Sequence, residues 1–156
     1  MDARLDLMTN EATAKFLKKF VAASHAMAGT VPAATQELVK LRASQINGCG
    51  FCTDMHFKDA VAAGESPTRL NLVAAWREAT VFTDAERAAL ALAEEGTRIA
   101  DAAGGVPDDV WAEAAKHYDE NQLGELVVVI SAINLYNRLN VLTLQPAGDY
   151  QPGQFG

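Results

Sequence analysis

The sequence predicts an all-α protein of about six to seven helices. Alanine, the best helix former, is very frequent, and the alternating patterns typical of β-strands are scarce. Glycine and proline fall mostly where helix ends are expected. The chain has 156 residues, 49% of them hydrophobic and 21% charged, which suits one globular domain rather than a disordered chain.

The first three helices follow from apolar spacing and from the residues that interrupt it. Apolar residues near 3.6-residue spacing predict a helix over 10–27, and Gly29 is typical of the position after a helix end. We expect the second helix over 33–46, because Asn47-Gly48 breaks the pattern. The third helix is predicted over about 50–64.

Helix-start signals define the fourth and fifth helices. Ser66-Pro67 is typical of an N-cap followed by a first-turn proline, and the helix it starts is expected to pass Trp76. Thr83-Asp84-Ala85-Glu86 has the capping-box pattern. It precedes a long Ala- and Leu-rich helix that we expect to end at Gly104-Gly105.

Two more helices complete the prediction. Pro107 starts a short helix that runs to about Tyr118, and the last helix covers about 121–143. Residues 127–130 are all β-branched and resemble a buried strand, but the helical pattern continues around them without a turn signal. We therefore expect a helix there.

The domain organisation is simple. No linker divides the chain, so we expect one helical domain over 1–145, followed by a flexible tail over 146–156 that is rich in Gly, Pro and Gln. Glu37-Leu38-Val39 recurs as Glu125-Leu126-Val127, each early in a helix. This recurrence hints at a duplicated helical unit.

Charge and hydropathy exclude several classes of protein. Thirteen basic residues against 20 acidic ones, a net charge of -7, argue against nucleic acid and against an anionic membrane surface as partners. The N-terminal residues lack the apolar run of a signal peptide, and residues 123–144 are expected to be too polar for a simple membrane span. We therefore expect a cytoplasmic protein.

The sharpest motif is Cys49-x-x-Cys52-x-x-x-His56. Two thiols at this spacing can close a small disulfide ring, and a helix start at Cys49 would stabilise a thiolate there. His56 lies one helical turn after Cys52 and could take a proton from it. A thiolate, a second thiol that resolves it and a base are the minimum parts of a dithiol peroxidase or disulfide reductase.

The same motif is compatible with two roles outside redox chemistry. The cysteines and His56 could bind zinc with Glu37 as a fourth ligand, although no second C-x-x-C is present, and the thiols could instead be inert core residues. A thioredoxin fold is excluded because it needs a βαβ pattern. The sequence has no glycine-rich phosphate loop, HExxH or GxSxG motif, so we expect no cofactor.

The sequence resembles the alkylhydroperoxidase D-like group of the carboxymuconolactone decarboxylase superfamily over about residues 10–145. Its most specific feature is a glutamate, Glu37, twelve residues before the C-x-x-C-x-x-x-H motif. The principal matching segments are Glu37-Leu38-Val39, Ala43-Ser44-Gln45-Ile46-Asn47-Gly48-Cys49-Gly50-Phe51-Cys52, Met55-His56-Phe57-Lys58-Asp59-Ala60, Ala75-Trp76-Arg77-Glu78, Phe82-Thr83-Asp84-Ala85-Glu86-Arg87, Ala132-Ile133-Asn134 and Asn137-Arg138-Leu139-Asn140.

The resemblance implies an all-helical fold assembled as trimers or hexamers, and antioxidant reduction of small hydroperoxides. It implies that Cys52 attacks the peroxide, that Cys49 resolves it, and that His56 and Glu37 form a proton relay. A partner dithiol of lipoyl or thioredoxin type would be the reductant. The helix dipole alone favours Cys49 as the more acidic thiol, so this order of the cysteines comes from the resemblance. Phe51 stands where the best-studied type of the family has a second histidine, which shortens the relay.

Two further functions remain as alternatives. The protein could be a non-catalytic redox sensor or interaction module whose cysteines switch its assembly. It could also be a decarboxylase-like enzyme that uses the same pocket without thiol chemistry, although that branch of the superfamily lacks the cysteine pair. Sustained peroxide turnover with a dithiol donor would distinguish the peroxidase from the sensor. Activity that survives replacement of both cysteines would favour the decarboxylase-like enzyme.

Overall fold

The computed structural model describes residues 2–27 and 29–155, and these residues form seven α-helices, a short 3₁₀ helix and no strand. The predicted all-α fold is confirmed. In chain order the elements are α1 (Ala14–His25), α2 (Ala33–Ile46), α3 (Gly50–Ala62), α4 (Pro67–Leu72), η1 (Val73–Ala75), α5 (Asp84–Thr97), α6 (Asp108–His117) and α7 (Glu120–Thr143).

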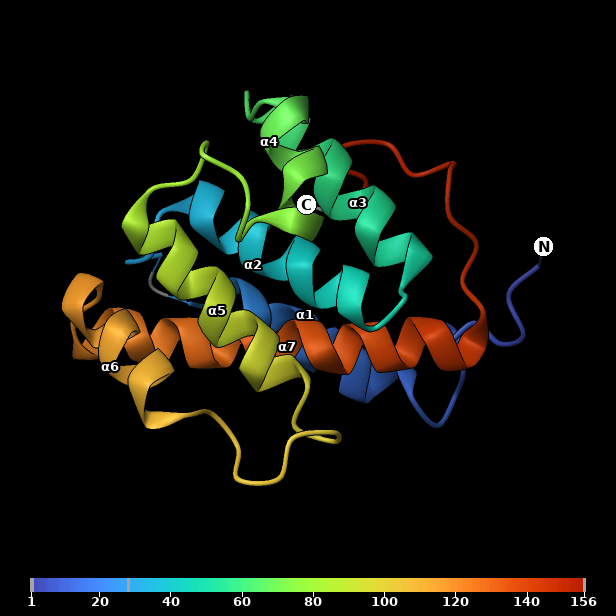
Figure 1. Cartoon of the computed structure of the whole chain (residues 1–156). Helices are drawn as coiled ribbons and strands as arrows, with labels where there is room; N and C mark the ends of the chain where they lie inside the picture. The colour runs from blue at the N-terminus through green and yellow to red at the C-terminus, as the bar shows by residue number, and fades with distance from the viewer. Residues whose placement is uncertain (1, 28, 156) are drawn as a thin grey trace.

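The helices are arranged around α2 and α7, as Figure 1 shows. The long α7 crosses the whole molecule, with α6 at its N-terminal end and α3 against its C-terminal half. Helix α2 lies in the interior and packs against α3, α5 and α7. Its Leu38, Val39 and Ala43 are fully buried. Because α2 touches all these elements, it fixes where α3 lies relative to α7.

The core consists of three apolar clusters. The largest joins α2, α5, α6 and α7 around Val39, Leu92 and Leu126. The second joins α2, α3, α4 and α5 around Leu41, Trp76 and Leu90. A third, small cluster contains both cysteines together with Ala43 and Ile133. The cysteine pair therefore lies against the interior of the fold, where its surroundings are fixed by packing.

Three predicted helices are shorter in the structure, and the first of them, expected over 10–27, covers only Ala14–His25. The expected capping box of Thr83 and Glu86 is present, but α5 ends at Thr97 rather than at Gly104. Ile99 just beyond that end is 58% exposed, so a longer helix would find no apolar surface to cover. Helix α4 ends at Leu72 and continues only as the η1 turn before Trp76.

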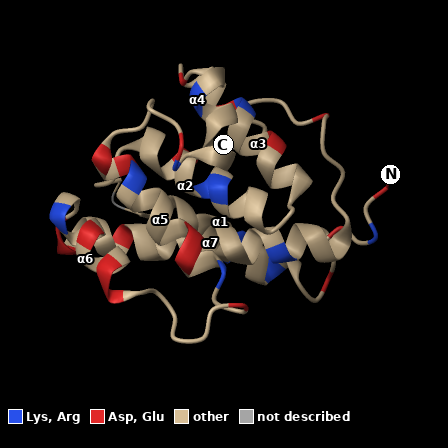
Figure 2. Cartoon of the chain, in the orientation of Figure 1, with Lys and Arg blue, Asp and Glu red and all other residues tan. Residues whose placement is uncertain are grey.

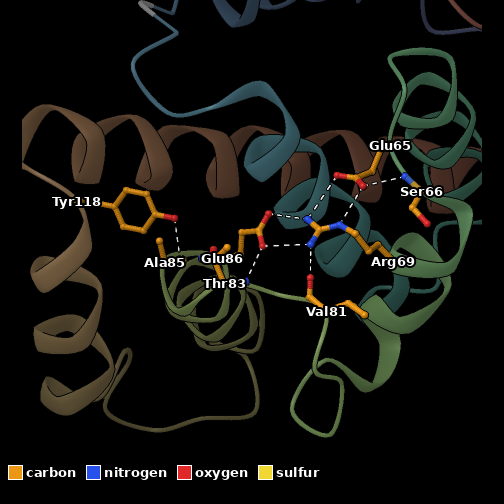
Figure 3. Close-up of polar contacts among 8 residues, drawn as sticks. All are labelled: Glu65, Ser66, Arg69, Val81, Thr83, Ala85, Glu86 and Tyr118. Carbon is orange, nitrogen blue, oxygen red and sulfur yellow. Dashed lines mark hydrogen bonds and ion pairs between the residues drawn. The ribbon is translucent and has the colours of Figure 1, made fainter.

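The segment from α4 to α6 is held by polar contacts that Figure 3 shows. Arg69 lies between two carboxylates, with Nε 2.9 Å from Glu65 Oε1 and Nη2 2.6 Å from Glu86 Oε1. Glu86 also accepts from the Thr83 backbone N–H, and the Tyr118 hydroxyl donates to the Ala85 carbonyl at 2.8 Å. These contacts tie α4 and the end of α6 to the start of α5.

Helix α7 is long and apolar enough to cross a membrane by length and composition alone, contrary to our expectation that this region is too polar. One face of the helix serves this fold, because Leu126, Val129, Ile130 and Ile133 are buried against other helices, whereas Leu142 is exposed. The buried face is part of the core. Figure 2 shows Lys and Arg dispersed among Asp and Glu over the helices in that view.

The C-terminal segment, which its composition predicts to be a flexible tail, makes defined contacts with α3. Residues 146–155 turn back along α3 (Figure 1). Lys58 Nζ donates to the carbonyls of Gly148 and Tyr150 at 2.7 and 3.0 Å. The Tyr150 hydroxyl lies 2.9 Å from both oxygens of Asp59, and Tyr150 is buried. The contacts of this segment thus come from side chains of α3, which the composition of the segment itself does not indicate.

Candidate active site

Both cysteines lie at the start of α3 and are bonded to each other as a disulfide with an S–S distance of 2.05 Å. Gly48 ends α2 with a φ of +66°, which glycine adopts without strain, and this turn allows the chain to enter α3 at once. Cys49 is 2% exposed and Cys52 is 1% exposed. The pair is therefore held in a rigid, nearly water-free position at a helix N-terminus.

Cys49 is the N-cap of α3, as the sequence suggested. Its Sγ accepts a hydrogen bond from the Cys52 backbone N–H at 3.2 Å. That N–H is one of the donors that a helix start leaves without an intrahelical partner. The contact places the positive end of the helix dipole at the Cys49 sulfur.

His56 and Glu37 meet, although they come from different helices. His56 Nδ1 lies 2.8 Å from Glu37 Oε2, because α2 packs against α3. Lys40 Nζ lies 2.8 Å from the other oxygen of Glu37. Burial opposes the ionisation of this carboxyl, but His56 and then Lys40 lower its pKa to about 2. The carboxylate can then only accept a hydrogen bond.

This acceptor determines how His56 can act. Nδ1 must carry the proton that it donates to Glu37. In the neutral ring, Nε2 is then the nitrogen with the free electron pair, and it is the atom that can exchange a proton at the site. His56 is 7% exposed and lies one helical turn after Cys52 on α3. Three of the predicted site residues, Cys49, Cys52 and His56, therefore lie in the first two turns of α3. The packing of α2 against α3 brings the fourth predicted residue, Glu37, to them.

An asparagine network holds the loop that leads to the cysteines, and the sequence pattern alone did not lead us to it. Asn47 Nδ2 donates to Oδ1 of Asn134 and of Asn137, both at 2.9 Å. Asn137 Nδ2 in turn donates to Ser44 Oγ at 3.0 Å, and the Cys49 N–H donates to the Ser44 carbonyl. The signal for this network was the spacing of three asparagines on one face of an otherwise apolar helix.

The third asparagine of this face, Asn140, contacts the cysteine pair itself. Its Nδ2 lies 3.3 Å from Cys52 Sγ. Asn140 also lines a pocket of about 630 Å³, together with Cys49, Phe51 and residues at the end of α7 and in the C-terminal segment. Another pocket, of about 660 Å³ between α2, α3 and α4, contains none of the four predicted site residues. Of these two pockets, the one lined by Asn140 is therefore the one that reaches the cysteine pair, at Cys49.

The geometry gives no support to a zinc site. In the part of the chain that the structure describes, no group of three or more His, Cys, Asp and Glu side chains is arranged to hold a metal ion. The two cysteines bond to each other, and Glu37 is engaged by His56 and Lys40. The arrangement is that of a disulfide-bonded cysteine pair on the same helix as an imidazole that contacts a carboxylate.

A sequence model described as the carboxymuconolactone decarboxylase family matches residues 11–95, which include the cysteine pair, His56 and Glu37. The chain belongs to the carboxymuconolactone decarboxylase family. The family match ends within α5, so it covers the whole predicted site but not Asn140.

Similar proteins place the chain within this family more closely. The uncharacterized protein YdfG of Bacillus subtilis is 43% identical over 107 residues, which are 69% of this chain and 71% of YdfG. A solved protein of unknown function from Agrobacterium tumefaciens, described as a candidate AhpD antioxidant defence protein, is 33% identical with a TM-score of 0.87, and the match covers 96% of this chain and 100% of that chain. The chain is thus an AhpD-like member of the carboxymuconolactone decarboxylase family.

A more distant structure shows the same fold. An uncharacterized peroxidase-related protein from Silicibacter sp. TM1040 is 18% identical, with a TM-score of 0.74 over 99% of this chain and 96% of that chain. At this identity the likeness concerns the fold alone. The family is named for an enzyme, and this member has a disulfide-bonded cysteine pair.

Proposed function

We propose that the protein is a dithiol-dependent hydroperoxide reductase of the cytoplasm, built on a single domain of residues 1–145. The observation that carries this proposal is that α3 carries both the Cys49–Cys52 disulfide and, one helical turn after Cys52, the His56 ring that contacts Glu37. Opening and closing a disulfide between neighbouring thiols transfers two electrons, and an adjacent imidazole can move the protons. The candidate AhpD antioxidant protein from Agrobacterium supports the same activity.

The catalytic cycle starts from the reduced pair. His56 Nε2 takes the proton of Cys52, while Glu37 holds the ring through Nδ1. The Cys52 thiolate attacks the terminal oxygen of ROOH, the O–O bond breaks, and the alkoxide leaves as ROH with the proton from His56. Cys52 is now a sulfenic acid.

Cys49 closes the cycle. Its sulfur attacks the Cys52 sulfur, the S–O bond breaks, and water leaves as the disulfide forms. A partner dithiol, of lipoyl or thioredoxin type, attacks the disulfide, becomes a disulfide itself and returns both cysteines to thiols. In sum, one hydroperoxide and one external dithiol yield an alcohol, water and an external disulfide. We expect the cycle to run in a homo-oligomer, a trimer or hexamer.

The roles of the two cysteines are tested by single-turnover reactions of reduced variants. Cys49→Ser protein should consume about one equivalent of cumene hydroperoxide per chain and gain a sulfenic acid that dimedone traps. Cys52→Ser protein should show neither change. The opposite pattern would exchange the two roles, and no consumption by either variant would contradict the peroxidase.

Sustained turnover distinguishes the enzyme from a redox sensor. The parent protein should consume many equivalents of hydroperoxide when dihydrolipoamide or a thioredoxin system is supplied. His56→Gln should lose this turnover, whereas the matched control His117→Gln, at the end of α6, should keep it. One oxidation per chain without further turnover would favour the sensor.

A further inference from the structure

The two cysteines receive different hydrogen bonds, and this difference leads to a role for Asn140. Cys49 Sγ accepts from the backbone at the start of α3, which favours a thiolate on Cys49. Cys52 is the residue to which the proposed function gives the attack on peroxide. Its own sulfur is contacted by the side-chain amide of Asn140, from α7, at 3.3 Å.

The amide of Asn140 is not needed elsewhere in the described structure. Asn134 and Asn137, on the same face of α7, donate through Nδ2 to Thr97, Ser44 and the backbone, so their amides support the fold. Cys52 Sγ is the acceptor of Asn140 Nδ2, and Asn140 is only partly buried. A disulfide sulfur is a weak acceptor, so this donor contributes most when the sulfur carries charge.

Asn140 also borders a pocket at the cysteine pair. Cys49 and Phe51 belong to the lining of this pocket, so the side chain that contacts the Cys52 sulfur also borders the space next to its disulfide partner. Figure 1 shows how this becomes possible, since α3 lies against the C-terminal half of α7. The side chain is therefore fixed by two packed helices rather than by a loop.

We propose that Asn140 is a catalytic residue of the dithiol site, which donates its side-chain N–H to the Cys52 thiolate as that sulfur attacks the peroxide. The catalytic part of this inference rests on the proposed function. The amide donor stabilises the charged sulfur before attack, whereas Cys49 has the helix N-terminus for the same purpose. Each sulfur thus has its own donor, and Cys52 can be activated although it lies inside the first turn of α3.

The test measures the Cys52 thiolate without any peroxide. In a Cys49→Ser background Cys52 is the single thiol, because the chain has two cysteines. The rate of its alkylation by iodoacetamide is followed against pH, together with the ultraviolet absorbance of the thiolate. The midpoint of this pH profile reports the ionisation of the Cys52 thiol. Adding Asn140→Leu, which keeps the side-chain size but removes the donor, should raise this midpoint by about one pH unit. Asn121→Leu, at an exposed position on the same helix, is the matched control and should leave it unchanged.

A second variant keeps the test decisive if Asn140→Leu folds poorly. Asn140→Asp keeps the shape and places a negative charge near the sulfur, so it should raise the midpoint further. Midpoints of both variants that match the parent, in proteins with parental circular dichroism and melting temperature, would overturn the inference. Peroxide turnover is measured separately: if the parent fails to turn over peroxide while the midpoint still shifts, the peroxidase is lost and the thiolate contact of Asn140 stands.

Discussion

Glu37 and Glu125 begin the same tripeptide, Glu-Leu-Val, on α2 and on α7, but their carboxylates have different partners. Glu37 faces two groups that can carry a positive charge, His56 and Lys40, each at 2.8 Å. One of them, His56, is an imidazole, whose ring nitrogens can donate and accept a proton. The surroundings of Glu37 therefore suit a carboxylate that takes part in proton movement.

Glu125 is surrounded by neutral donors. It accepts hydrogen bonds from the backbone N–H groups of Gly29, Thr30 and Val31, at 3.0, 2.6 and 3.1 Å, from the Thr30 hydroxyl, and from Gln36 Nε2. Burial works against ionisation, but the Thr30 hydroxyl and these N–H groups lower the pKa of the carboxyl. This carboxylate ties the segment before α2 to α7, and none of these donors is a group with which it can exchange a proton near neutral pH.

The comparison shows that neither the residue type nor the neighbouring sequence tells whether such a carboxylate has a functional role. The same three residues serve a proposed proton relay in one helix and a structural clamp in the other. The groups that contact each carboxylate distinguish the two roles. Glu37 contacts the imidazole of His56, whereas Glu125 contacts backbone N–H groups. The following changes test this distinction.

The largest expected effect is on turnover. Glu37→Gln should lower kcat for hydroperoxide by about 100-fold, because the amide no longer stabilises a proton on His56. Glu125→Gln should leave turnover per folded chain within about twofold. Steady-state peroxide consumption with excess dihydrolipoamide measures both. Equal losses in the two variants would remove the distinction between relay and clamp.

The next effect is on stability, and here Glu125 is the residue whose replacement matters. Glu125→Gln should lower the free energy of unfolding by about 2 kcal/mol, because the new amide group faces backbone donors that it cannot satisfy. Urea unfolding followed by circular dichroism measures this. Glu120→Gln, in the first turn of the same helix, is the control and should cost less than about 1 kcal/mol. A parental midpoint for Glu125→Gln would count against the clamp.

The smallest effect is on acid stability. The folded pKa of Glu37 is about 2, below its ordinary value of 4.5, so its contribution is complete above 4.5 and is lost as the pH falls toward 2. Going from neutral pH to about pH 3.5 should cost the parent about 1 kcal/mol from this group. Glu37→Gln should show a correspondingly smaller acid loss in urea unfolding at the two pH values. The same loss in both proteins would mean that the ionisation of Glu37 does not contribute to the pH dependence of stability.

Much of the site could be predicted because its parts lie close together in the chain. Cys49, Cys52 and His56 fall within one helix start, and the helical repeat alone places Cys52 and His56 on one face. The bounds of α2, Ala33–Ile46, were likewise predicted, and the local signal for its end was Asn47-Gly48. Glu37 is different, because the resemblance to a family, and not the spacing, pointed to its contact with His56.

Several features could not be predicted because they depend on contacts between distant parts of the chain. The role of Asn140 requires that α7 pass beside Cys52, a contact across 88 positions of sequence. The contacts of the C-terminal segment with Lys58 and Asp59 of α3 likewise do not follow from its composition. The early end of α5 depends on where the neighbouring helices stop offering an apolar surface.

The sequence by itself determined that the protein is helical and that two thiols and an imidazole share one helix start, since local propensity and the helical period act over a few residues. The tertiary structure decided which carboxylate reaches the imidazole, which amide reaches the Cys52 sulfur and what surrounds the pocket. Those contacts join separate helices, and only the packing of α2, α3 and α7 into one core fixes their distances.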